Sequence, residues 1–244
     1  DEKRRKRESA QRKVRLEELS KARQALTGGA LAPGTPETLA ELKDETKRPI
    51  RLTADLPAAA LEYRPDRPIG ITFKLFVRTL KAAARGASGG AGGCTNEHLK
   101  VALDDEDTAA LLHAAALRLA SAKLPPAAAA AFMTARMTAL LKSNGRVRGI
   151  ATGTAFRRLV ASCIARVIGP EADRACRPFK YALTTRAGTE CVGHLFRAAC
   201  DLDPELCILS IDGVGAFDHI RRAAMLGKLV TLPTARDALP FVRL

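Results

Sequence analysis

A run of apolar residues that recurs every three or four positions between residues 156 and 168 constrains the fold more than any other feature. Its members are Phe156, Leu159, Val160, Cys163, Ile164, Val167 and Ile168. This spacing aligns them on one face of an α-helix, whose other face carries Arg157, Arg158 and Arg166. Gly169 and Pro170 follow, and we expect them to end the helix. The pattern predicts an amphipathic helix that buries its apolar face.

The core around this helix must be built mainly from aliphatic side chains. Hydrophobic residues make up 47% of the 244 residues, aromatic residues only 4%, and Trp is absent. Such a composition suits packed helices better than sandwich sheets. The apolar runs are too short to span a membrane, and the charged N-terminus lacks the apolar region of a signal peptide. We therefore expect a soluble intracellular protein with no membrane partner.

The formal net charge of +14 indicates a polyanionic partner. Nucleic acid is the favoured one, because each phosphate that is neutralised releases counterions. An anionic membrane surface and solubility alone are the alternatives. The six cysteines lack the two-residue spacing of a zinc knuckle and the four histidines are scattered, so we expect reduced thiols and no Cys metal site.

Composition divides the chain into four segments. Residues 1–26 are a basic, charged helix, which we interpret as solvated, although Arg4 to Arg7 could also act in nuclear import or RNA contact. Residues 27–68 are rich in Pro and Gly and are interpreted as a linker. Residues 69–205 are a helix-rich folded region that includes a second amphipathic helix. This helix should run from Thr189 to about Cys200 and bury Val192, Leu195 and Phe196.

Residues 206–244 open with a short apolar strand, residues 206–211, that ends at Asp212. A glycine turn and a closing helix from Ala216 to about Val230 follow. A carboxylate at the end of a buried strand, beside a glycine turn, is a common place for a metal, but such an Asp is as often a helix cap. The combination of helices, hairpin and strand predicts an α+β fold.

Residues 137–150 carry a β-hairpin pattern centred on Ser143-Asn144-Gly145. A two-residue turn, which is the usual turn for an Asn-Gly pair, would point Lys142 away from Arg148. A three-residue loop with Gly145 left-handed would instead place Lys142, Arg146 and Arg148 on one face, where a triphosphate could use them. The sequence leaves both registers open.

The loop of residues 86–93 is rich in glycine and precedes a short helix that begins near Glu97, with Thr95 or Asn96 as its N-cap. Glycine loops can cradle phosphates, but this one follows no strand and lacks the Gly-Lys-Ser/Thr ending of a P-loop. On residues alone, we interpret it as a flexible loop.

Four segments, taken in order, resemble the reverse transcriptases of non-LTR retrotransposons. Residues 89–99 are similar to that family's Gly-Pro-x-Gly…Glu-x-Leu motif, and residues 142–150 with the following Phe-Arg-Arg-Leu to its fingers hairpin. Residues 178–189 resemble its Gln-x-Gly-Phe…Gly-x-Thr segment. Residues 210–220 resemble its first palm motif, Asp-x-x-x-Ala-Phe-Asp-x-Ile/Val. The resemblance covers about residues 66–230 and implies helix-rich fingers, residues 69–205, leading through the hairpin into the start of a palm, residues 206–244.

The resemblance also implies roles for individual residues. Asp212 would be the catalytic, metal-binding carboxylate, with the carbonyl of Gly213 as a second ligand for Mg²⁺. Lys142, Arg148 and, more loosely, Arg146 would bind the incoming dNTP. Phe217 would be an aromatic gate against the ribose 2′-hydroxyl, although a core aromatic fits it nearly as well. The positions expected near an RNA template paired with a DNA primer are Gly92, Asn96, Arg157 and Lys180.

The sequence departs from the reverse transcriptase motifs at several positions, and these departures limit the polymerase activity expected of this chain. No Asp-Asp pair follows Asp212, Gly149 replaces the usual Pro, and Lys180 and Ala182 replace the usual Gln and Gly. We therefore expect a fragment of an RNA-directed DNA polymerase, truncated before its palm is complete and inactive alone. The alternatives are a non-catalytic, basic RNA- or DNA-binding protein derived from a retroelement, and a structural helical protein whose charge serves solubility.

Overall fold

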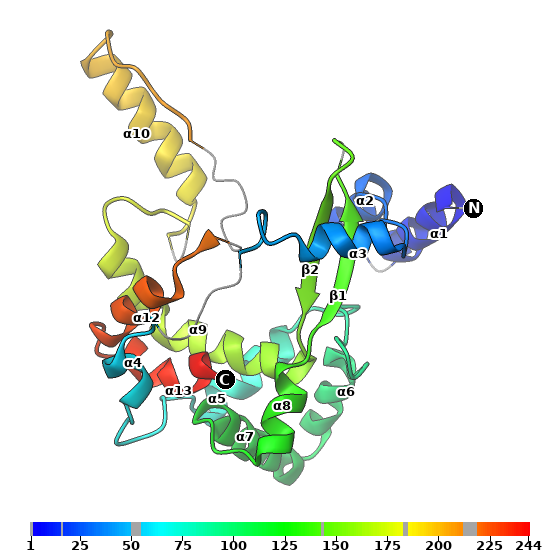
Figure 1. Ribbon diagram of the computed structural model, residues 1–244, viewed down its shortest axis with the longest axis vertical. Helices are drawn as coiled ribbons and strands as arrows, with labels where there is room; N and C mark the ends of the chain where they lie inside the picture. Colours follow the sequence, from blue (N-terminus) through cyan, green and yellow to red (C-terminus); the bar gives the residue numbers. More distant parts are fainter. Residues whose placement is uncertain (1, 16, 50–54, 143, 183–184, 212–218) are drawn as a thin grey trace. The chain divides into compact units, whose positions relative to one another are not determined.

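The computed structural model describes residues 2–15, 17–49, 55–142, 144–182, 185–211 and 219–244 (Figure 1). Within these ranges it is rich in helices and contains one two-stranded antiparallel sheet, which confirms the α+β class. The chain forms two compact units: residues 1–44 with 137–151, and residues 45–136 with 152–244. No helix in the described ranges is both long and apolar enough to cross a membrane.

The first unit contains a helical pair, a third helix and most of the hairpin. Helices α1 (Glu2–Arg15) and α2 (Leu19–Thr27) pack together and bury Ala10 and Ala22. Helix α3 (Pro36–Lys43) lies within the stretch expected to be a linker and begins after Thr35, whose hydroxyl accepts a hydrogen bond from the Thr38 amide. Strands β1 (Arg136–Leu141) and β2 (Val147–Thr152) follow much later in the chain.

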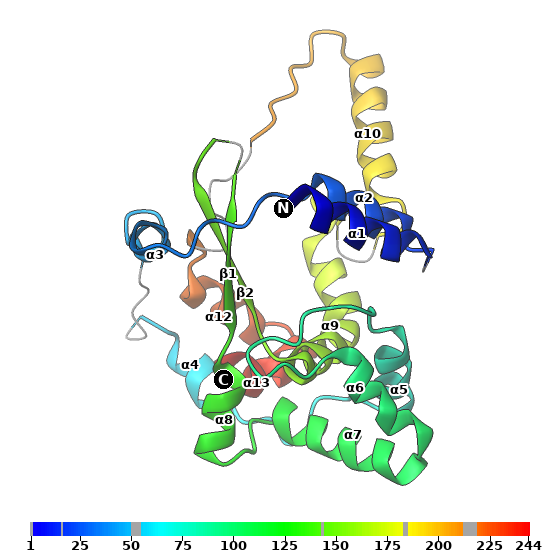
Figure 2. The same ribbon diagram turned by 90° about the vertical axis from the view of Figure 1, so that its right-hand side faces the viewer.

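The second unit is built from helices around α9 (Ala155–Cys176). The remaining helices of this unit are α4 (Ala58–Glu62), α5 (Phe73–Ala82), α6 (Asn96–Lys100), η1 (Val101–Asp104), α7 (Glu106–Ala120), α8 (Pro126–Met133), α10 (Gly188–Leu202), α12 (Arg222–Val230), η2 (Ala235–Ala238) and α13 (Leu239–Arg243). Helices α5 and α7 both contact α9 and lie beside it in the two views (Figures 1 and 2).

The apolar face predicted for residues 156–168 is the centre of the main core. Leu159, Val160, Cys163 and Ile164 are buried there. They pack with residues of α5, α7 and α13, among them Phe76, Leu80, Leu119 and Phe241. Phe156, Val167 and Ile168 are partly buried at its edge. A smaller cluster joins α4, α12 and α13 through Ala60, Leu226 and Leu239.

The predicted end of this helix at Gly169-Pro170 is wrong, because α9 continues through Pro170 to Cys176. A proline inside a helix removes one backbone hydrogen bond and costs about 3 kcal/mol. Contacts of the second half of α9 offset that cost. The carboxylate of Glu171 accepts hydrogen bonds from the amides of Thr234 (3.0 Å) and Ala235 (2.8 Å). Burial raises the pKa of Glu171, but these hydrogen bonds outweigh it and leave the pKa below its ordinary value.

Two predictions for the C-terminal part are also wrong. Residues 206–211 form neither strand nor helix, and Leu209 and Ile211 are 80% and 82% exposed. An apolar run becomes a strand only when another strand hydrogen-bonds to it, and none of the described residues does so. The second amphipathic helix exists as α10, but it buries none of its residues, and Leu195 and Phe196 are exposed. Amphipathic spacing predicts which face would be buried without supplying the surface that buries it.

Candidate nucleic-acid interface

Backbone hydrogen bonds define the loop of the β1–β2 hairpin. The Lys142 amide donates to the Arg146 carbonyl (2.8 Å), and the Gly145 amide donates to the Lys142 carbonyl (3.0 Å). The Arg146 amide donates to Oδ1 of Asn144 (3.2 Å). Gly145 has a φ of +77°, a left-handed conformation that glycine adopts without steric cost. The result is a three-residue loop in which Lys142 lies opposite Arg146.

This loop decides between the two registers that the sequence leaves open. Residues opposite each other in an antiparallel pair place their side chains on the same face of the sheet. Residues two apart along a strand do the same. Lys142, Arg146 and Arg148 therefore share one face of the hairpin, and the two-residue Asn144-Gly145 turn is wrong.

Helix α3 covers the opposite face of the hairpin. A Cβ atom added at Gly149 would lie 3.0 Å from Cδ2 of Leu42 and 3.1 Å from Sδ of Met137. The amide of the buried Val147 donates to Oε1 of Glu41 at 3.0 Å. The absence of a side chain at Gly149 thus lets Leu42 of α3 approach the strand closely.

The segment that follows α2 holds the free edge of β1. Leu31 forms an antiparallel bridge with Leu140. The Leu141 amide donates to the Ala30 carbonyl (2.8 Å), and the Ala32 amide donates to the Ala139 carbonyl (3.0 Å). One face and one edge of the hairpin are therefore occupied by the same unit, whereas the face with the three cations remains exposed.

The three cations form a concentrated patch of positive charge. All three residues are exposed, and no described residue of their unit forms an ion pair or hydrogen bond with the side chain of Lys142, Arg146 or Arg148. Opposite residues lie about 5 Å apart and next-but-one residues about 7 Å apart at the backbone. In water, each pair of like charges at such distances repels by about 0.6–0.8 kcal/mol. A ligand with several negative charges would convert this repulsion into attraction.

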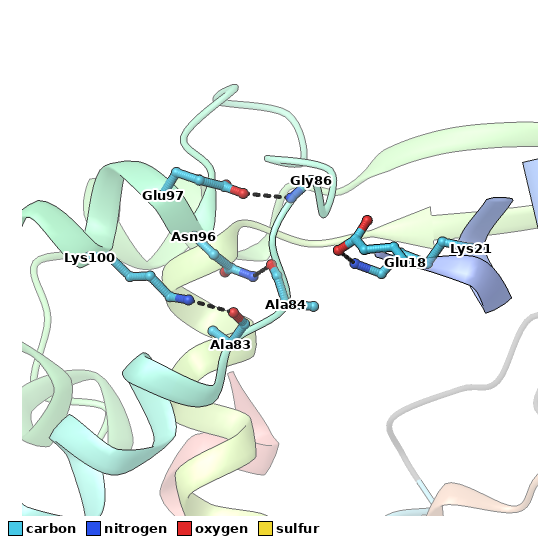
Figure 3. A network of polar contacts seen from close by, with 8 residues as sticks. All are labelled: Glu18, Lys21, Ala83, Ala84, Gly86, Asn96, Glu97 and Lys100. Carbon is cyan, nitrogen blue, oxygen red and sulfur yellow. Dashed lines mark hydrogen bonds and ion pairs between the residues drawn. The ribbon is translucent and has the colours of Figure 1, made fainter. Parts of the chain in front are cut away.

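Residues 83–86 of the second unit, which lead into the glycine-rich loop and include its first glycine, form polar contacts with α6, as Figure 3 shows. The Gly86 amide donates to Oε1 of Glu97 (2.5 Å), and this hydrogen bond is the main cause of the lowered pKa of Glu97. Nδ2 of Asn96 donates to the Ala84 carbonyl (2.8 Å), and Nζ of Lys100 donates to the Ala83 carbonyl (2.8 Å). The predicted N-cap is confirmed as Thr95, whose amide donates to Nδ1 of His98. The segment between α5 and α6 is thus fastened to α6 at three points.

The other residues of this unit that were predicted to contact nucleic acid each have different surroundings. Arg157 lies over the ring of Phe241, 5.7 Å from its centroid, whereas its neighbour Arg158 donates a hydrogen bond to the Ser88 carbonyl. Lys180 is exposed beyond the end of α9. Gly92 would have no atom within 4 Å of an added Cβ, so space does not require glycine there.

Gly89 and Gly90 are the glycines of this loop at which an added Cβ would clash, and sequence reasoning did not single them out. A Cβ at Gly89 would lie 2.4 Å from the carbonyl carbon of Gly93. Gly90 has a φ of +72°, and a Cβ there would lie 2.5 Å from the carbonyl oxygen of Gly153. Because Gly90 and Gly153 lie far apart in the sequence, no local pattern could reveal this contact.

Replacing Gly90 with alanine should destabilise the loop, whereas Gly92→Ala should have little effect. The left-handed conformation alone costs about 1–2 kcal/mol for a residue with a Cβ, and the contact with Gly153 adds to it. Trypsin cleavage after Arg85, followed by gel electrophoresis, measures the effect. We expect the Gly90 variant to be cut faster than the Gly92 variant; equal rates would contradict the close approach to Gly153.

The residues implied for the metal and the sugar gate, Asp212, Gly213 and Phe217, lie outside the described residues. Elsewhere in the chain that is described, no three His, Cys, Asp or Glu side chains gather closely enough to hold a metal ion. The positions of Lys142, Arg146 and Arg148 are therefore the part of the expected site that the geometry specifies.

Comparison with known proteins adds no family to this description. No protein-family model, no curated protein and no solved structure matches the chain.

Proposed function

We propose that this chain contributes to RNA-directed DNA polymerisation, with the exposed hairpin face binding the phosphates of the incoming dNTP. The observation that carries the proposal is the register of the hairpin, which places Lys142, Arg146 and Arg148 on one face. Charge-assisted hydrogen bonds from Lys and Arg to phosphate oxygens are short and strong, and they neutralise charge that develops during phosphoryl transfer.

The order of the four family-like segments supports the same proposal. In it, Asp212 and the carbonyl of Gly213 would be metal ligands, and two Mg²⁺ ions would activate the primer 3′-hydroxyl and stabilise the leaving pyrophosphate. Lys142 and Arg148 would position the triphosphate, and Phe217 would select the deoxyribose. The RNA template and DNA primer would be bound by the basic surface of the chain, consistent with its net charge of +14.

Photocrosslinking tests the hairpin directly. The chain is irradiated with 8-azido-dATP, and the modified peptides are identified by mass spectrometry. We expect modification within residues 136–152 that an excess of unlabelled dATP suppresses and that deoxyadenosine, which lacks phosphates, does not. Labelling that is spread over the chain, or that deoxyadenosine suppresses equally, would argue against a phosphate site on the hairpin.

A non-catalytic RNA- or DNA-binding protein is the second candidate, favoured by the five exposed arginines of α1. These are Arg4, Arg5, Arg7, Arg12 and Arg15. Substitution of Asp212 with Asn in a full-length context, assayed for primer extension on an RNA template and for nucleic-acid binding, separates the candidates. A polymerase loses synthesis and keeps nucleic-acid binding, whereas a binding module loses nothing measurable.

A further inference from the structure

A polar pocket of about 250 Å³ lies in the second unit, between the C-terminal end of α5, the start of α6 and one face of α9. Its lining residues are Thr79, Ala82, Ala83, Ala84, Asn96, Arg158, Leu159, Ser162 and Arg166. Two of them are arginines and none is acidic. Neither Ser162 nor Arg166 belongs to the motifs that suggested a polymerase.

The spacing of the polar residues along α9 explains how the pocket is formed. Arg158, Ser162 and Arg166 follow one another at four-residue intervals, so their side chains lie on the same face of the helix. Buried Leu159 and the alanines at the end of α5 supply an apolar wall. A hydroxyl between two guanidinium groups, beside an apolar wall, matches an anionic group attached to an apolar body.

The charges around the pocket favour an anion. No described residue forms an ion pair or hydrogen bond with the side chain of Arg166. A third cation stands at the rim, because Nζ of Lys100 is held 2.8 Å from the carbonyl of Ala83, as seen in Figure 3. The nearby Glu97 carboxylate, by contrast, already accepts the hydrogen bond of the Gly86 amide. Arg158, Arg166 and Lys100 carry three positive charges, and Glu97 carries one negative charge. The surroundings of the pocket are therefore positively charged overall, which favours an anionic ligand.

The size of the pocket limits what can enter it. Sites for drug-sized ligands range from about 300 to 1,000 Å³, so a pocket of about 250 Å³ suits a smaller group. A phosphate with the sugar or base of one nucleotide combines an anion that guanidinium groups bind well with an apolar ring surface. The α5 end and the fastened segment after it form the wall for such a ring.

We propose that this pocket binds the phosphate ester of one nucleotide, with Arg158, Ser162 and Arg166 as the phosphate ligands. The nucleotide is either free or a unit of a nucleic-acid strand, since both present the same group. The pocket belongs to the unit that does not contain the hairpin face, and the inference does not rest on the polymerase proposal.

Arginine modification by phenylglyoxal, mapped by mass spectrometry, tests occupancy of the pocket. The probes are dTMP, a dT10 oligonucleotide and thymidine, which lacks the phosphate. With dTMP at about ten times its Kd, modification of Arg166 should slow about tenfold, because the reagent needs the empty site. Arg118, an exposed arginine of α7, serves as the reference. Protection of Arg166 by dTMP identifies a free nucleotide as sufficient, and protection by dT10 alone identifies a strand.

Two variants make the test independent of the reagent. Arg166→Ala should weaken binding of the protecting probe about tenfold in calorimetry, because one charge-assisted contact is lost. Arg118→Ala, which removes the same charge from the same unit, should leave the affinity within about twofold. Equal protection of Arg166 and Arg118, protection by thymidine, or no protection by any probe overturns the proposal.

The photocrosslinking experiment separates this proposal from the polymerase proposal. If azido-dATP does not label the hairpin while Arg166 is still protected, the result counts against the polymerase proposal alone.

Discussion

Replacing Arg148 with glutamate should weaken dATP binding by about tenfold to a hundredfold, which corresponds to the loss of one charge-assisted contact and the gain of a repulsive one. Arg148 lies on the exposed face that also carries Lys142 and Arg146, so the new carboxylate would pair with those cations and neutralise the face. Because no described residue of its unit forms an ion pair or hydrogen bond with the side chain of Arg148, the fold should be unaffected. Calorimetric titration with dATP, with circular dichroism as the folding check, measures both effects.

Lys43→Glu is the matched control for this variant. Lys43 is an exposed residue of α3 in the same unit, and its reversal changes the net charge by the same amount. Its effect on dATP affinity should stay within about twofold, since α3 covers the other face of the hairpin and long-range effects are screened by salt. If the two variants weaken binding equally, the affinity depends on total charge rather than on the hairpin face.

Nucleic-acid binding by the same two variants gives an independent measure of the contact. Each phosphate contact that is lost lowers the slope of log affinity against log salt by about one. We expect Arg148→Glu to reduce this slope for an RNA template paired with a DNA primer, and Lys43→Glu to leave it unchanged.

The parts of the fold that the sequence predicted correctly are those that depend on a single helix. The repeat of residues 156–168 specified a buried face, and Leu159, Val160, Cys163 and Ile164 occupy the core as expected. The helix was predicted to end at Pro170 because the free-energy cost of a proline can be inferred from the local sequence. The hydrogen bonds that Glu171 accepts from Thr234 and Ala235 cannot, because these residues lie more than sixty positions away. A local rule fails where a distant partner stabilises the segment.

Features that need a specific partner were the least predictable. Residues 206–211 are apolar enough for a strand, but strand formation depends on a neighbour that composition cannot identify. Helix α10 shows the same limit: its amphipathic spacing was recognised, but Leu195 and Phe196 on its apolar face are exposed. The hairpin was recognised from Asn144-Gly145, yet its register depended on whether both residues or Gly145 alone adopted the left-handed conformation, and an Asn-Gly pair is compatible with either turn.

Replacing Phe76 with alanine should lower the free energy of unfolding of the second unit by about 3–5 kcal/mol, the usual cost of removing a buried aromatic ring. The side chain of Phe76, on α5, is fully buried in the core that it shares with residues of α7, α9 and α13. Its ring centroid lies 5.4 Å from that of His113, whose Nε2 is 2.8 Å from the carbonyl of Ile71. The cavity would therefore remove contacts with three helices and weaken the support of the segment that leads into α5.

Urea denaturation followed by far-ultraviolet circular dichroism measures this loss, because the chain lacks Trp for a fluorescence readout. Phe179→Ala is the matched control: it removes the same side chain from a position that is 91% exposed, and the stability should change by no more than about 0.5 kcal/mol. Phe76→Leu, which keeps part of the volume, should fall between the two. Since domains of this size are stable by only about 5–15 kcal/mol, the alanine variant should lose a large part of its margin at 37 °C. A Phe76 variant as stable as the Phe179 variant would mean that α5 does not pack into this core.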